Sequence, residues 1–181
     1  MQRPRIDLIT VFGLGKMRPA SGTWGSLPPV LVAALLLAVG LGQTSWPDST
    51  NPAPHWNTLY WVIYHGVLLT IFIFFSAACL SQGTAAEAHF REKDPSNVVA
   101  DEVAGQCLPL MFLPAVAIDT TFKAAITLVL AFLAFRIMDI VKPWPAGQLQ
   151  RVPGGLGILI DDLFAGIYAL VIVQVCIAIT M

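Results

Sequence analysis

Three charged side chains close a long apolar run and could act on an anionic ligand. Arg136, Asp139 and Lys142 are three residues apart, so on a helix they lie within roughly 120° of arc. Pro143 follows at once and ends the helix. Two cations and a carboxylate on one face of an apolar helix are unfavourable unless they face protein, water or a charged ligand. Taken alone, the pattern fits equally well a set of interfacial side chains anchored by Trp144.

Five carboxylates stand near the ends of apolar segments and are the predicted catalytic residues: Asp101, Glu102, Asp139, Asp161 and Asp162. Acids that share a poorly solvated site cannot all be ionised without a cation. Oxygen ligands without a neighbouring His or Cys favour Mg²⁺ over Mn²⁺ or Ca²⁺. The predicted Mg²⁺ ligands are Asp101, Asp139, Asp161 and Asp162.

Adjacent acids on a helix diverge by roughly 100°. We therefore expect one member of each pair, Asp101-Glu102 and Asp161-Asp162, to face the site, and the other to support it or face solvent. The alternative is a structural role in which these acids pair with Arg136 and Lys142.

A glycine-rich stretch over residues 13–26 offers donors for a phosphate, namely Lys16, Arg18, Thr23, Ser26 and the glycine amides. Successive amides ahead of a helix can bind an anion. The stretch is not a Walker A loop, because Met17 follows Gly15-Lys16. An ordinary glycine loop is the alternative. The predicted phosphate-binding side chains are Lys16, Thr23, Arg136 and Lys142.

The elements that must position these residues are five apolar segments, at residues 27–41, 57–80, 98–118, 124–140 and 158–179. Their lengths predict an all-α, polytopic membrane bundle of about five transmembrane helices. The segment at 98–118 contains two prolines, Pro109 and Pro114, and is the weakest crossing.

The basic residues lie before the first segment, in the loop 82–97 and in the loop 136–153, whereas the two opposite loops carry none and one. The positive-inside rule then places the N-terminus in the cytoplasm and the C-terminus outside. This topology puts the glycine-rich stretch and all the charged clusters at the cytoplasmic ends of their helices. Metal, cations and a phosphate loop at the inner leaflet indicate phosphoryl chemistry on a lipid headgroup.

Composition narrows the classes further. The 181 residues are 56% hydrophobic and 12% charged, which predicts one membrane-embedded domain over 1–181. The net charge of −1 argues against a nucleic-acid partner. Three cysteines without C-x-x-C spacing indicate packing residues. No cysteine lies in a loop followed by Arg and no D-x-D motif is present, which argues against a phosphoenzyme. His55 falls on the far side and His65 in an apolar run, and His89, on the cytoplasmic side, lacks a partnering motif. Metal-activated water remains as the nucleophile.

Four motifs resemble those of the phosphatidylglycerophosphatase A family, at residues 19–27, 94–105, 135–145 and 154–166. They occur in the family's order and span most of the chain. Ser21 departs from the pattern, because the family usually has proline there. The resemblance implies a bacterial inner-membrane, Mg²⁺-dependent lipid phosphatase that converts phosphatidylglycerophosphate into phosphatidylglycerol. It says nothing of the oligomeric state.

Two rivals remain. A small transporter or channel for Mg²⁺ or a phosphorylated anion would carry its charges at the membrane midplane, whereas these stand at one end. A non-catalytic scaffold would need no set of carboxylates. A CDP-alcohol transferase is disfavoured because its Asp-Gly-x₂-Ala-Arg pattern is absent.

Overall fold

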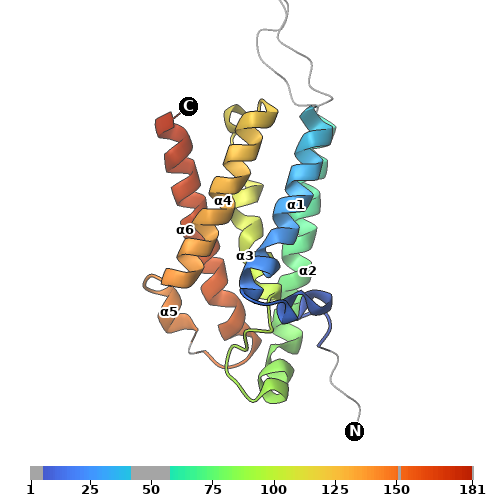
Figure 1. Ribbon diagram of the computed structural model, residues 1–181, viewed down its shortest axis with the longest axis vertical. Coiled ribbons are helices and arrows are strands. Elements are labelled where there is room, and N and C mark those ends of the chain that lie inside the picture. The colour runs from blue at the N-terminus through green and yellow to red at the C-terminus, as the bar shows by residue number, and fades with distance from the viewer. Residues whose placement is uncertain (1–5, 42–57, 151, 181) are drawn as a thin grey trace, which may run out of the picture.

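The computed structural model describes residues 6–41, 58–150 and 152–180, and within these ranges the regular elements are all helices. Four helices are long and apolar enough to span a membrane: α1 (Ser21–Leu41), α2 (Thr58–Phe90), α4 (Thr121–Val141) and α6 (Gly155–Thr180). They run side by side along the long axis of the molecule (Figure 1). The predicted all-α membrane bundle is confirmed.

The third predicted segment differs from the other four. It forms only a 12-residue helix, α3 (Ala100–Met111), followed by irregular chain and the short 3₁₀ helix η2 (Ala115–Ala117). Among the described residues, four rather than five helices therefore have the length of a membrane span. Pro114 limits α3, because it has no N–H to donate to the carbonyl of Leu110.

Side chains of the long helices satisfy the carbonyls that this break leaves free. The Tyr64 hydroxyl of α2 donates to the Leu110 carbonyl at 2.8 Å, and Thr127 Oγ1 of α4 donates to the Ala117 carbonyl at 2.9 Å. Gln174 Nε2 of α6 donates to the Phe112 carbonyl. Irregular backbone at membrane depth is tolerated only when it is buried and satisfied in this way.

Small residues let α3 and α6 approach their neighbours closely. A Cβ on Gly105 of α3 would collide with the backbone of Asp162 and the ring of Phe135, and one on Gly166 of α6 would collide with the backbone of Gly105. Gly155 likewise lies against the backbone of α2 at Cys79. Such contacts are the usual means of tight helix packing in membranes.

Two helix boundaries differ from the sequence-based expectation. α1 begins at Ser21 rather than at residue 27, and it carries Pro28 and Pro29 inside it. α2 continues to Phe90, ten residues beyond the expected end, because Ala86 is fully buried and Gly83 packs against Gly155.

We call one end of the bundle the site end; α1, α3 and α6 begin there, and α2 and α4 end there. Three further elements lie at this end: η1 (Val11–Lys16), the short helix α5 (Ala146–Leu149) and the turn after α2 (Figure 1). The predicted loop 42–56 with His55, and the basic residues Arg3, Arg5 and Arg151, lie outside the described residues.

Candidate active site

A cavity of about 310 Å³ opens at the site end of the bundle. We call it the active-site cavity. The first turn of α1, the start of α3, the last turns of α4 and Asp162 of α6 all line it. Its charged lining residues are Asp94, Asp101, Glu102, Arg136, Asp139, Lys142 and Asp162. Clusters that are far apart in the sequence thus meet in one cavity.

Arg136 ties three helices together at the wall of this cavity. Its Nη1 lies 2.7 Å from Asp139 Oδ2 on α4 and 3.4 Å from Glu102 Oε1 on α3. The same nitrogen donates to Ser26 Oγ on α1 at 3.3 Å, and Ser26 in turn donates to the Gly22 carbonyl. The guanidinium is therefore held in place while its Nε has no partner among the described residues.

Two glycines of α1 make room for this cluster. A Cβ on Gly22 would collide with Glu102 Oε1 and the guanidinium of Arg136, and one on Gly25 would collide with Glu102 Oε2 and Val99. The glycines predicted as a flexible phosphate loop thus partly serve another purpose, because from Ser21 onward the chain is already helical.

Lys142 is positioned by a turn that is unusual for a non-glycine residue. It caps α4 in the left-handed region, with φ 44° and ψ 62°, and its N–H donates to the Met138 carbonyl. This conformation is disfavoured by roughly 1–2 kcal/mol. The side chain places Nζ 2.5 Å from Asp161 Oδ2 and 3.8 Å from Asp94 Oδ2. Burial lowers the pKa of Lys142, but the hydrogen bond and charge of Asp161 outweigh it, so the pKa lies above its usual value and the lysine stays charged.

The carboxylates of the site are buried, and several of their oxygens lack a hydrogen-bond partner in the described part of the chain. Asp101, Asp139, Asp161 and Asp162 are at most 8% exposed. Among the described residues no hydrogen-bond partner is found for Asp101 Oδ1, Glu102 Oε2, Asp161 Oδ1 or Asp162 Oδ2. Buried and unpaired carboxylate oxygens are unfavourable unless a proton or a cation reaches them.

The two acids of α3, which is not one of the four spanning helices, have raised pKa values. Burial, followed by the charges of Glu102 and Asp94, raises the pKa of Asp101 well above its usual range. Burial also raises the pKa of Glu102, to about 8, although Arg136 opposes this.

The donor set fits a hard divalent cation by its chemistry. The unpaired oxygens of Asp101, Glu102, Asp161 and Asp162 are carboxylate oxygens, which Mg²⁺ prefers. In the described part of the chain, however, no three His, Cys, Asp or Glu side chains stand close enough together to form a ready ligand set.

The predicted site residues are distributed unevenly around the cavity. Six of them line it: Asp101, Glu102, Arg136, Asp139, Lys142 and Asp162. Both members of the pair Asp101-Glu102 do so, where we expected only one. Asp161 reaches the cavity through its contact with Lys142. Lys16 lines a neighbouring cavity, and Thr23 lines neither of the two.

Sequence reasoning missed Asp94 as a site residue. It lines the cavity, lies near Lys142 and accepts a hydrogen bond from Gln150 Nε2. The available signal was its place in the turn Asp94-Pro95, directly before the segment that carries Asp101. The two described histidines do not line the cavity: His65 contacts the Trp61 carbonyl, and His89 lies edge-on against Phe90.

Comparisons with known proteins identify the family of this chain. The family model described as Phosphatidylglycerophosphatase A matches residues 8–177. A Haemophilus influenzae protein named phosphatidylglycerophosphatase A is 31% identical over 176 residues, covering 93% of this chain and 86% of the relative. An Escherichia coli K12 protein of the same name is 34% identical over 142 residues, covering 73% of this chain and 76% of the relative.

A third relative, from Bacteroides thetaiotaomicron, is provisionally named as a phosphatidylinositol-3-phosphatase. It is 32% identical over 151 residues, covering 78% of this chain and 91% of the relative. No solved structure matches the chain.

Proposed function

The chain belongs to the phosphatidylglycerophosphatase A family and is a membrane phosphatase, and from this premise we propose that it hydrolyses the terminal phosphate of phosphatidylglycerophosphate to give phosphatidylglycerol. The observation that carries the proposal is the active-site cavity, in which two cations and five carboxylates meet. Binding a phosphomonoester requires such cations, and hydrolysing it requires a means of activating water.

The residues of the chain have separate tasks in this proposal. Arg136 and Lys142 bind the phosphoryl oxygens, because both line the cavity and both are held in place by carboxylates. The first turn of α1, at Ser21 and Gly22, lines the same cavity. A helix N-terminus favours an anion through its free amides and its dipole.

We further propose that the reaction depends on Mg²⁺. Asp101 and Asp162, which have unpaired carboxylate oxygens, would hold the ion. Asp139 and Asp161 would support it, because each already contacts a cationic side chain through one oxygen. When bound, the ion supplies positive charge at the phosphate and lowers the pKa of a bound water. Without a cation these carboxylates would repel one another, so the residues of the site would be held together only when the ion is bound.

The proposed location is the bacterial inner membrane with the cavity facing the cytoplasm. Support comes from the distribution of basic residues in the described part of the chain. Lys123 lies at the opposite end, whereas the site end carries Lys16, Arg18, Arg91, Lys93, Arg136 and Lys142. Such an excess is typical of the cytoplasmic side.

A transporter or channel for Mg²⁺ or a phosphorylated anion is the alternative. It would carry its polar site near the midplane between broken helices. The cavity instead lies where α1, α3 and α6 begin and α4 ends, which favours the hydrolase.

Phosphate release from phosphatidylglycerophosphate in detergent tests the proposal. We expect release with Mg²⁺ and loss of activity with a chelator, restored by added Mg²⁺. Phosphatidylinositol 3-phosphate serves as the comparison substrate, because one relative is named for it. No release from phosphatidylglycerophosphate would refute the proposed substrate, and full activity in the chelator would refute the metal.

A further inference from the structure

A second cavity, of about 250 Å³, adjoins the active-site cavity. Residues 15–21 form most of its wall, and Ser96 and Asn97 complete it. Ala20, Ser21 and Ser96 line both cavities, so the two are neighbours around the start of α1. We call the second one the cationic cavity.

The two cavities differ in charge. Of the residues that the structure describes, Lys16 and Arg18 are the only charged ones that line the cationic cavity, and no acid lines it. Among the described residues neither of them forms an ion pair, whereas Arg136 and Lys142 are both paired with carboxylates. Two unpaired cations beside a helix N-terminus favour an anion.

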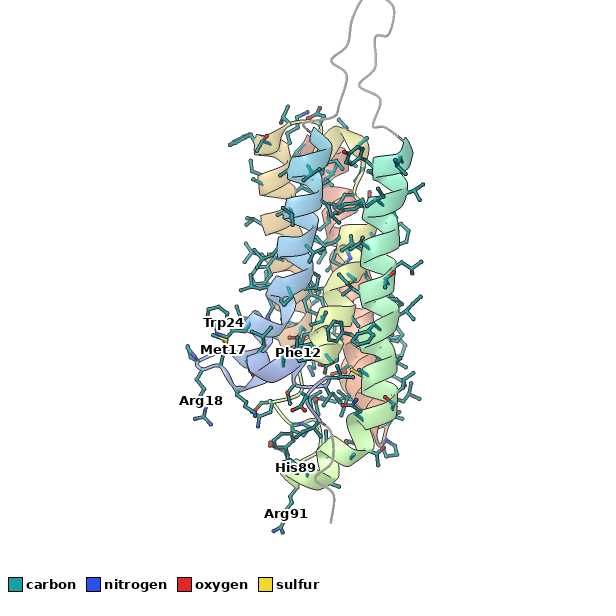
Figure 2. The ribbon with its side chains drawn as sticks, turned by 90° about the vertical axis from the view of Figure 1, so that its right-hand side faces the viewer. Phe12, Met17, Arg18, Trp24, His89 and Arg91 are labelled. Carbon is teal, nitrogen blue, oxygen red and sulfur yellow. The ribbon has the colours of Figure 1, made fainter. Side chains whose placement is uncertain are left out.

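Beyond the cationic cavity the surface becomes apolar. Met17 lines this cavity and is 41% exposed, and Trp24 on α1 is 36% exposed. Figure 2 shows both side chains on one flank of the molecule, with Arg18 reaching past them at the site end. Trp at this level, on the outer surface of a spanning helix, is typical of the boundary between lipid and water. Going outward from the active-site cavity, the next surface is therefore the cationic cavity, and the apolar, lipid-facing flank follows it.

We propose that the cationic cavity binds the phosphodiester of the lipid substrate, with Lys16 and Arg18 as its ligands. This inference rests on the proposed function. Phosphatidylglycerophosphate carries, in order, a phosphomonoester, a glycerol, a phosphodiester and two acyl chains. That order matches the order of the three surfaces. Lys16 then contacts the phosphate that is kept rather than the one that is cleaved, and the pair selects lipids that carry both groups.

The double variant Lys16→Gln/Arg18→Gln tests the assignment in mixed micelles at fixed lipid mole fraction. The KM for phosphatidylglycerophosphate should rise by about tenfold or more, the scale of losing a charge-assisted hydrogen bond, with a much smaller change in kcat. Two inhibitors separate the subsites. Phosphatidylglycerol keeps only the phosphodiester, so its inhibition constant should rise about tenfold, whereas inorganic phosphate occupies the active-site cavity and its constant should stay within about twofold.

Arg91→Gln is the control: it removes one exposed cation from the site end, where the double variant removes two, and Arg91 lines neither cavity. Figure 2 shows Arg91 at the tip of α2, away from Arg18. Equal effects of the control and the double variant would overturn the inference, as would a parallel rise of both inhibition constants. Absence of any wild-type hydrolysis of phosphatidylglycerophosphate would instead refute the proposed function, and the inference with it.

Discussion

At the scale of single residues, the two cations of the active-site cavity each perform two tasks. Arg136 and Lys142 line the cavity, and each neutralises at least one buried carboxylate. Removing one partner of a buried ion pair leaves a buried charge uncompensated. Any loss of activity in variants of these residues must therefore be separated from a loss of stability.

Replacing Arg136 or Lys142 by Ala should lower kcat/KM by on the order of 10²-fold or more, the scale of losing one charge-stabilising donor. The reason is that both cations face the proposed phosphate site. Steady-state kinetics measure the effect, and thermal unfolding of the same samples monitors the fold. Lys123→Ala is the control, since Lys123 pairs with Asp119 at the opposite end of the bundle. Near-wild-type kcat/KM in both variants would leave these cations a purely structural role.

Replacing Asp101, Asp139 or Asp162 by Asn should raise the Mg²⁺ concentration that gives half-maximal activity by about tenfold or more, since even supporting residues of metal sites have effects of this size. The shape of the side chain is kept and only the ligand charge is lost. In the Asp101 and Asp162 variants the fold should survive without metal, because a repulsive charge is gone. Asp139→Asn also removes a partner of Arg136, so thermal unfolding of this variant is measured as well.

Titration of activity with Mg²⁺ measures this shift, and Asp119→Asn, far from the cavity, is the control. Full activity of all three variants at limiting Mg²⁺ would place the metal elsewhere.

The sequence could predict the charged members of the site but not the residues that make space for them. The spacing of Arg136, Asp139 and Lys142 is local and visible in the chain. The fit of Gly22 and Gly25 against Glu102 and Arg136 depends on contacts across about a hundred residues, which no local pattern reports.

At the scale of elements, the segment formed by α3 and η2 depends on hydrogen bonds from the neighbouring helices. Tyr64→Phe should reduce the free energy of unfolding by about 1 kcal/mol, because it leaves the Leu110 carbonyl without the partner that Pro114 cannot supply. Denaturation in detergent measures the change. Tyr60→Phe on the same helix is the control, since no hydrogen bond of the Tyr60 hydroxyl is found within the described ranges. Equal stability of the two variants would show that the Leu110 carbonyl is satisfied in another way.

The same elements show where sequence patterns reach their limit. The length of the apolar segments predicted all four spanning helices, because each helix that crosses a bilayer needs a long apolar stretch. It placed the start of α1 too late, because the first turns of this helix, from Ser21 to Ser26, are mostly Ser, Gly and Thr and so lie outside the apolar segment. The prolines marked the third segment as the weakest crossing, but hydrophobic length could not show that its free carbonyls are satisfied by donors from three other helices.

At the scale of the whole molecule, the proposed orientation can be tested by chemical labelling. Ser96 is exposed at the site end, so a cysteine there, with Cys176 replaced, should react with an impermeant thiol reagent in inverted vesicles and stay unmodified in intact cells. The reason is the excess of basic residues at that end. A cysteine in place of Lys123 should show the opposite pattern. Modification at position 96 from outside intact cells would reverse the orientation.

The segment formed by α3 and η2 also constrains the order in which the protein can be assembled during its synthesis. The segment carries Asp101, Glu102, Gln106 and two prolines, so it gains little by entering a bilayer alone. Two of the helices that satisfy its free carbonyls, α4 and α6, follow it in the chain. During synthesis the free carbonyls of this segment can all be satisfied only after α6 has been inserted. Because α3 carries Asp101 and Glu102 and α6 carries Asp162, the active-site cavity is complete only at that stage.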